Sequence, residues 1–331
     1  MAIQTKKIAE EKALKIKKES KLLLTQQKRG KLKIVLSKNM PLFILTLPAL
    51  IYFILFHYAP MFGVVMAFKD FKYNLGILGS PWVGFKNFEF FFTSNDAWRI
   101  LRNTVGYSIL FIVVTNGVAL IVALLLNEIK NKLVLKIHQT AMLMPHFLSW
   151  VLVGFITYIF LSPMMGVLNQ FLEGLGLEGR EWYSEPGHWP YILTVTSLWK
   201  GVGLQILFYY AALLTVDPQL YEAARIDGAN KLKQAWYISI PAVLPIMTIL
   251  MILAIGDTFR GDFGLFYQIP RDVGLLYSTT DIIDTYIFRG LRTGDMGVTA
   301  AVGLFQSVVG LILILIVNWI VKKIKPENAL F

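Results

Sequence analysis

The stretch LYEAARIDGANKLKQAWYISIPAVLP (Leu220–Pro245) places a short, charged helix between two long apolar runs. Just before it, Asp217 is suited to be an N-cap, and Pro218 takes the first helical position, where the missing N–H of proline does no harm. A helix of about ten residues is marginal in water by itself. This segment therefore needs another surface to hold it.

The end of this charged helix is marked as clearly as its start. Asp227 and Gly228 predict a left-handed C-cap. Asn230 can cap a second helix, KLKQAWYISI, which runs into Pro241. The sequence therefore predicts a helix, a tight turn and a second helix.

The side chains of the first helix suit a docking surface. Ala223 and Ala224 are small enough for a partner's surface to come close, while Glu222 and Arg225 offer that partner one anion and one cation. An amphipathic helix lying on a lipid bilayer would show the same pattern. The residues alone leave both interpretations open.

The composition around this segment is that of a polytopic membrane protein. Of 331 residues, 56% are hydrophobic and 14% aromatic, and 16% are charged, against about 25% in ordinary soluble chains. The absence of cysteine excludes disulfides, thiolate metal sites and a cysteine nucleophile. The histidines are widely spaced, without the pairing that zinc needs, so no metal site is expected; they are His57, His138, His146 and His188.

Much of the formal charge of +11 lies in the first 38 residues, which run directly into an apolar segment. This arrangement indicates a cytoplasmic basic arm attracted to anionic lipid head groups, and not a nucleic-acid-binding protein. The arm is helix-prone and somewhat amphipathic, so a helix on the membrane surface is expected. Its long charged region and the full span after it argue against a cleaved signal peptide.

Six apolar stretches are long enough to cross about 30 Å of hydrocarbon. They are Pro41–Ala67, Thr104–Leu126, Thr140–Leu161, Tyr191–Leu214, Ile240–Ile255 and Val298–Val321. Two prolines interrupt the start of the fifth, so we expect it to be short, kinked and surrounded by protein. Most of the 32 Lys and Arg residues then fall on one side of the membrane, which places both termini in the cytoplasm.

The six stretches lack features of proteins that transport alone. They are nearly free of ionisable residues, and Lys200 and Asp257 lie near span ends, whereas channels and secondary carriers usually place such groups within the membrane. No nucleotide-binding G-x-x-x-x-G-K-[ST] motif occurs. Trp199, Gln205 and Tyr209 could line a polar, aromatic path, although the same residues could equally serve helix packing.

The spacing of the central stretch resembles a known family. Glu222-Ala223-Ala224, then Gly228, and later Ile238 and Ile240-Pro241 match the EAA motif of binding-protein-dependent ABC importer permeases, E-A-A-x3-G-x9-I-x-L-P, with Ile240 in place of Leu. YEAARIDGAN resembles the branch that imports di- and oligosaccharides. GVLNQFLEGLGL (166–177) and SPWVGFKNFEFFF (80–92) are similar to that branch too, the latter to permeases paired with lipoprotein binding proteins for polysaccharide fragments.

This resemblance implies an all-α, polytopic membrane protein with six transmembrane helices and the MetI-like core of type I ABC importer permeases. It implies a basic cytoplasmic arm at 1–39, a six-span permease domain at 40–321 with a cytoplasmic coupling loop at 215–240, and a cytoplasmic tail at 322–331. The protein would be a multi-pass component of a bacterial cell membrane.

The resemblance also implies a function. The charged helix would be the coupling helix, with a docking core of Glu222, Ala223, Ala224 and Gly228, flanked by Tyr221, Arg225 and Asp227. The expected partners are a second, similar permease in a heterodimer, two ATPase subunits that bind ATP and Mg, and an extracellular sugar-binding lipoprotein. The chain would be no enzyme and hold no cofactor or metal. A stand-alone secondary carrier or channel is the alternative.

Overall fold

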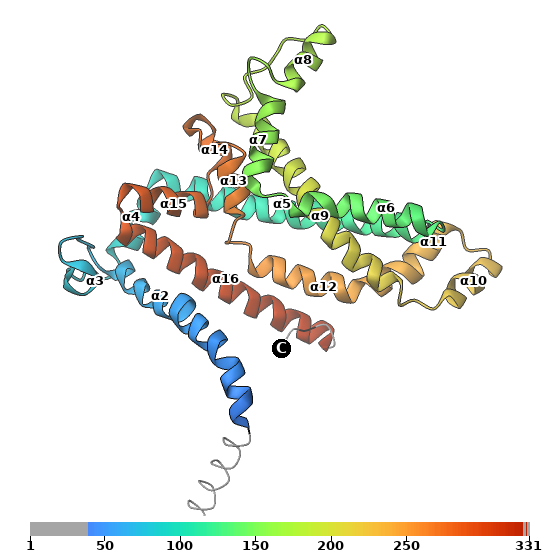
Figure 1. The fold of residues 1–331 in the computed structure, drawn as a ribbon, viewed down its shortest axis with the longest axis horizontal. Coiled ribbons are helices and arrows are strands. Elements are labelled where there is room, and N and C mark those ends of the chain that lie inside the picture. The colour runs from blue at the N-terminus through green and yellow to red at the C-terminus, as the bar shows by residue number, and fades with distance from the viewer. Residues whose placement is uncertain (1–38, 327–328, 330–331) are drawn as a thin grey trace, which may run out of the picture. The chain divides into compact units, whose positions relative to one another are not determined.

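The computed structural model describes residues 39–326 and residue 329, whose regular elements are helices apart from one isolated bridge between Lys69 and Trp82 (Figure 1). The chain divides into two units, residues 1–63 and 64–331. Residues 1–38 of the expected basic arm lie outside the described residues, as do residues 327, 328, 330 and 331 of the expected tail.

The described part of the first unit is helical from Asn39 onward. It continues through a π turn, η1 (Ile54–Tyr58), and α2 (Ala59–Met61), and a 3-10 helix, η2 (Phe62–Phe68), carries the chain into the second unit. Almost all its side chains are exposed although most are apolar. A helix that is apolar on every face needs lipid or another protein around it, which agrees with the expected first span.

The second unit contains the remaining helices. They are α3 (Gly76–Gly79), α4 (Lys86–Thr93), α5 (Asn95–Asn127), α6 (Lys132–Leu143), η3 (Met144–Phe147), α7 (Trp150–Leu161), α8 (Val167–Gly174), η4 (Pro186–His188), α9 (Trp189–Leu213), α10 (Pro218–Ile226), α11 (Lys231–Gln234), η5 (Ala235–Ser239), α12 (Ile240–Gly256), α13 (Phe263–Gln268), η6 (Gly274–Leu276), α14 (Tyr277–Thr280), α15 (Ile283–Thr293) and α16 (Met296–Ile324). Four helical stretches in this unit are long and apolar enough to cross a membrane, namely Asn95–Asn127, Pro186–Leu213, Lys231–Gly256 and Met296–Ile324.

The expected third span, Thr140–Leu161, is not one straight helix. The stretch Lys132–Phe147 and helix α7 meet at an angle of 98°. Pro145 lacks the N–H that would continue an α-helix, and the Ser149 hydroxyl accepts a hydrogen bond from the Leu152 N–H at 3.3 Å, which starts a new helix. The expected six spans are found only if this bent pair counts as one.

The expected fifth span is longer than the sequence indicated. Helices α11, η5 and α12 form one continuous stretch of 26 residues from Lys231 to Gly256. The π turn η5 directly precedes Pro241, and in it the Ile240 N–H donates to the Ala235 carbonyl, five residues earlier. This wider turn relieves the clash that the Pro241 ring would make with the preceding turn of an ordinary α-helix. The helix also continues through Pro245.

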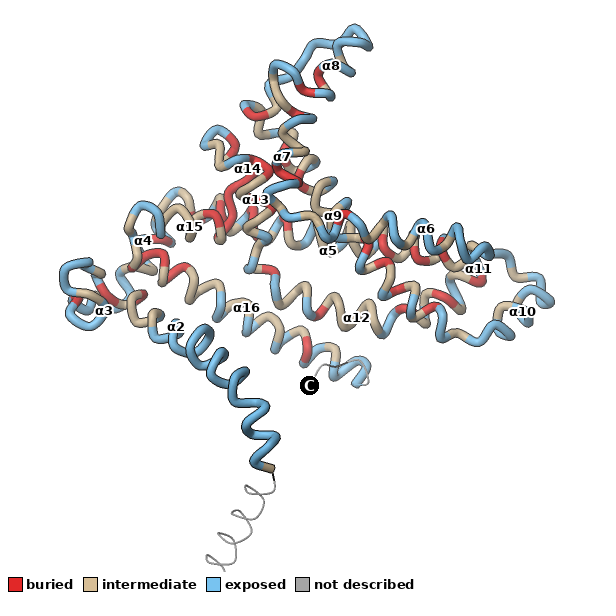
Figure 2. Tube along the Cα trace, viewed as in Figure 1, coloured by how far each residue is buried: buried red, intermediate tan, exposed pale blue. Residues whose placement is uncertain are grey.

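Three apolar clusters hold the second unit together. One joins α5, α9 and α12, where Ala119 and Ala123 are fully buried and let the helices approach closely. A second joins α4, α5, α15 and α16, and a third packs the residues after α12 against α5, α7 and α9. Buried residues accordingly gather where α13 and α14 meet α7 (Figure 2).

A buried carboxylate ties the segment between α12 and α16 to helix α5. The Asp281 side chain is fully buried, and it lies 3.0 Å from Arg99 Nη2 and 2.5 Å from Arg289 Nη2. The Thr285 hydroxyl donates to it at 2.9 Å, and Asn103 Nδ2 donates to the Asp281 carbonyl at 3.0 Å. This network fixes the turn before α15 on the side of α5.

A second carboxylate in this segment gives the fold a pH dependence. Burial raises the pKa of Asp284 above 3.8, and hydrogen bonds from the Gly261 N–H and Gln306 Nε2 lower that pKa by less. The folded protein thus binds a proton at the Asp284 carboxyl more tightly than the unfolded chain does. The stability that this proton contributes is present below the unfolded pKa of Asp284 and is lost as the pH rises through its folded pKa.

We therefore expect Asp284→Asn, which mimics the protonated carboxyl, to gain stability relative to the parent as the pH rises from about 4 to about 7. Thermal unfolding of the detergent-purified protein across that range measures the difference. Asp257→Asn serves as the control, because Asp257 is exposed. A constant difference between the Asp284→Asn variant and the parent at every pH would contradict this prediction.

Candidate functional site

The charged helix is α10, and its ends match those predicted. The Asp217 side chain accepts a hydrogen bond from the Gln219 N–H at 2.9 Å, with Pro218 in the first turn. The Asn230 side chain accepts from the Lys233 N–H at 2.9 Å and starts the helix that becomes the fifth span. The predicted helix, turn and second helix are confirmed.

Gly228 forms the turn between the two helices. Its φ of +76° lies in the left-handed region, which side chains other than glycine rarely adopt. The Gly228 N–H donates to the Arg225 carbonyl at 3.1 Å, and the following Ala229 N–H donates to the Ala224 carbonyl at 2.8 Å. These bonds satisfy carbonyls at the end of α10 and fix its direction.

Two side-chain contacts attach this region to the spans. The Tyr221 and Ser239 hydroxyls share a hydrogen bond of 2.9 Å, so α10 is bonded to the π turn of the fifth span. Lys231 Nζ lies 2.5 Å from Glu128 Oε2, just beyond the end of α5. A groove of about 320 Å³ between α10 and the end of α5 is lined by Asn127, Glu128, Lys130, Leu213, Leu214, Val216, Pro218, Tyr221, Glu222, Arg225 and Lys231.

The rest of α10 is open to the surroundings (Figure 2). Glu222, Ala223, Arg225, Asp227 and Gly228 are exposed, whereas Tyr221 and Ala224 are half-buried. Leu220 and Ile226 flank them with 54% and 87% of their surfaces exposed. Within the described residues, no ion pair engages the side chains of Glu222 or Arg225. The helix thus presents apolar side chains and two unpaired opposite charges on one short, well-capped element.

The three residues considered for a substrate path do not meet around one cavity. Gln205 Nε2 donates to Asn116 Oδ1 at 2.9 Å, and the Tyr209 hydroxyl donates to the same oxygen. Tyr209, on α9, is fully buried and bonded to α5 through Asn116. Trp199 is 45% exposed and lines a separate apolar groove between α7 and α9.

The sequence marked Lys200 as a charge near a span end but gave no sign of its contacts, and Ser239 carried no signal of its own. Lys200 Nζ donates to the His146 carbonyl at 3.0 Å and lies 4.9 Å from the centre of the Trp150 ring. Ser239 became notable only through its bond to Tyr221. Their partners are distant in sequence, so a pattern read along the chain does not find them.

Comparison with known proteins places this arrangement in a family. Residues 115–326 match the model of the "Binding-protein-dependent transport system inner membrane component" family, a match that contains α10, the last four spans and part of the second. The chain belongs to this family. It is accordingly a multi-pass inner-membrane permease subunit of an ABC system, a transport component and not itself an enzyme.

Several permeases of this family are similar over most of the chain. The polygalacturonan/rhamnogalacturonan transport system permease protein YteP of Bacillus subtilis (strain 168) is 38% identical over 314 residues, which cover 93% of this chain and 95% of that protein. The arabinooligosaccharides transport system permease protein AraP of Halalkalibacterium halodurans is 31% identical over 209 residues, or 61% of this chain and 64% of that protein.

A solved permease structure shares the fold. The crystal structure of a bacterial ABC transporter involved in the import of the acidic polysaccharide alginate contains a chain that matches with a TM-score of 0.82 and 31% identity, covering 89% of this chain and 99% of that one. The expected all-helical ABC permease fold is thereby confirmed.

Proposed function

We propose that this chain forms one half of the membrane pathway of an ATP-driven importer for oligosaccharides or polysaccharide fragments, and that α10 is its coupling helix. One observation carries the assignment of α10. The helix is capped at both ends, bonded to the fifth span by Tyr221, and otherwise exposed, with its two opposite charges unpaired. A short element so arranged is suited to transmit a partner's movement to the span.

The mechanism follows from this attachment. ATP binding closes two ATPase subunits, which draws together the coupling helices docked in them. Tyr221, Glu222, Ala223, Ala224, Arg225, Asp227 and Gly228 form the proposed contact. Shifting a two-state equilibrium from 1:99 to 99:1 requires about 5.5 kcal/mol of differential binding. Nucleotide binding by the partners supplies that free energy, and ATP and Mg belong to them.

The proposed assembly contains four kinds of partner. They are a second, similar permease in a heterodimer, the two ATPase subunits, an extracellular sugar-binding lipoprotein, and the oligosaccharide itself. In this assembly α10 and both chain termini face the cytoplasm. The loops at 69–103, 162–190 and 256–297 face outward, where the binding protein docks. The alginate transporter has been solved in complex with an alginate pentasaccharide-bound periplasmic protein, which supports this placement.

The substrate class rests on the relatives. Two similar permeases are named for polygalacturonan/rhamnogalacturonan and for arabinooligosaccharides, and a third belongs to an importer of alginate. A saccharide of more than one ring is their shared cargo. Trp199, Gln205 and Tyr209 remain proposed contacts along its path, and their alanine variants are expected to lower uptake while the complex still assembles.

Uptake by the reconstituted complex tests the proposed function. Proteoliposomes that contain the permease pair, the ATPases and the binding protein should accumulate labelled oligosaccharide only with ATP and Mg on the side of α10. A catalytically inactive ATPase is the control. Uptake that an ion gradient drives without the ATPases would overturn the proposal in favour of a secondary carrier.

A further inference from the structure

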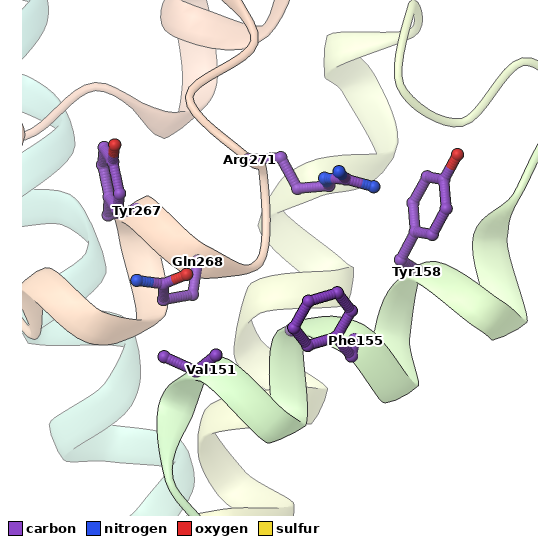
Figure 3. Close-up of a pocket in the computed structure, with 7 residues that line it drawn as sticks. Val151, Phe155, Tyr158, Tyr267, Gln268 and Arg271 are labelled. Carbon is purple, nitrogen blue, oxygen red and sulfur yellow. The ribbon is translucent and has the colours of Figure 1, made fainter.

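A small cavity lies between α7 and the segment that follows the fifth span, away from α10. Its volume is about 230 Å³. Phe155 and Tyr158 line it from α7, Tyr267 and Gln268 from α13, and Arg271 from the turn after α13 (Figure 3). No carboxylate lines this cavity, so its only formal charge is the positive charge of Arg271.

The Arg271 guanidinium rests on an aromatic ring but has no hydrogen-bond or ion-pair partner among the described residues. Its central carbon lies 4.1 Å from the centre of the Tyr158 ring, and Figure 3 shows it reaching across the cavity toward that ring. A guanidinium that rests on a ring face keeps its N–H groups free at its edge. Across residues 39–326, no acceptor takes a hydrogen bond or ion pair from Arg271.

The turn that presents Arg271 is strained and held in place. Arg271 and Asp272 have φ values of +58° and +52°, the only positive φ values at non-glycine residues in the described chain. Asp272 anchors the turn, because its carboxylate accepts from the Tyr277 hydroxyl at 2.9 Å and from Arg289 Nη1 at 3.5 Å. Strain that the surrounding structure maintains in this way clusters at binding sites.

The remaining lining groups suit a sugar ring. Tyr267 is stacked on Phe263 with ring centres 5.0 Å apart, so its ring is fixed. The Gln268 side-chain amide has no bonding partner in the part of the chain that the structure describes. A Cβ on Gly154 would lie 2.8 Å from the Gln268 carbonyl, so α7 and α13 are in backbone contact at the floor of the cavity.

We propose that this cavity is a subsite for one uronosyl residue of the transported oligosaccharide. The sugar carboxylate would pair with the edge of the Arg271 guanidinium, a hydroxyl would bond to the Gln268 amide, and the ring would pack on Phe155. A planar guanidinium matches a carboxylate with two parallel hydrogen bonds. This inference rests on the proposed function and adds to it that the cargo is acidic.

Transport of a charged and an uncharged trimer tests the subsite. The probes are trigalacturonate and its methyl ester, taken up by the complete reconstituted complex. For Arg271→Gln, we expect the KM for trigalacturonate to rise about 10- to 100-fold, the loss expected when charged hydrogen bonds are removed. The KM for the methyl ester should stay within about twofold, since the ester offers no charge to the arginine.

Two further variants keep the test independent of folding. Lys86→Gln removes one exposed positive charge from α4 and should change neither KM. Arg271→Lys keeps the charge without the planar fork and should restore part of the preference for the charged trimer. Transport of the methyl ester by each variant shows that its complex has assembled.

The possible outcomes separate the two proposals. An Arg271→Gln complex that loses both trimers equally would show that Arg271 serves folding or the binding protein's acidic side chains, which overturns the subsite alone. Equal KM values for the charged trimer in parent and variant also overturn the subsite alone. A parent complex that transports a neutral oligosaccharide but neither trimer overturns the subsite alone, whereas one that transports no oligosaccharide overturns the proposed function and the subsite with it.

Discussion

Gly228→Pro is expected to abolish capture of the ATPase subunit and ATP-driven uptake. Proline fixes φ near −65°, whereas this position holds +76°, and proline lacks the N–H that bonds the Arg225 carbonyl. The end of α10 must therefore unwind or turn away. Co-purification of a tagged permease with its ATPase measures the loss, which should exceed about 100-fold in retained ATPase, since a rebuilt turn removes the docking geometry.

Gly176→Pro provides a matched control for this experiment. Gly176 also has a positive φ, +78°, no atom stands within 4 Å of an added Cβ, and its N–H also bonds a helix end, at Glu173. It lies after α8, far along the chain from α10.

Glu222→Lys reverses an exposed charge on α10 without altering the turn and should also lower capture of the ATPase subunit. Full capture by both Gly228→Pro and Glu222→Lys would show that α10 does not dock.

Asp281→Ala is expected to destabilise the second unit strongly. The variant leaves Arg99 and Arg289 facing each other without their shared carboxylate, in a place where the Asp281 side chain is fully buried. Removing one partner of a buried ion pair costs about 3–5 kcal/mol. We expect the thermal unfolding midpoint of the purified permease to fall by roughly 10 °C.

A second carboxylate that pairs with Arg99, but is exposed, provides the control for Asp281→Ala. Asp96 also pairs with Arg99, at 2.9 Å, but 47% of its side chain is exposed. Exposed pairs contribute about 0–1 kcal/mol, so Asp96→Ala should lower the midpoint by no more than a few degrees. Equal shifts for the two variants would mean that burial does not set the strength of the Asp281 network.

The sequence predicted the elements whose signals lie in residues close together along the chain. Apolar length located the spans, and the caps at Asp217, Gly228 and Asn230 located the ends of α10 and the start of the next helix. The bend after Pro145 was missed, since a proline near a span is compatible with either a kink or a break. The π turn before Pro241 was missed because π turns have no distinct composition.

The contacts that the sequence could not predict join residues far apart in the chain. Asp281 and Arg99 are 182 residues apart, and nothing near either residue names the other. Arg271 follows Pro270 in an ordinary loop sequence, and its left-handed backbone, its place over Tyr158 and its lack of a partner exist only in the folded chain. Both features depend on how α13 and α15 pack on α5 and α7.

The unbroken helix from Lys231 to Gly256 has a mechanical consequence. Its 26 residues extend about 39 Å at about 1.5 Å per residue, close to the thickness of a membrane. Tyr221 is bonded to it at Ser239, about a third of the way from Lys231 to Gly256. A tilt of about 10° about the Lys231 end would sweep the Gly256 end sideways by about 7 Å. Under the coupling role that we propose for α10, a small displacement at Ser239 would therefore become a larger displacement at the Gly256 end of the same helix.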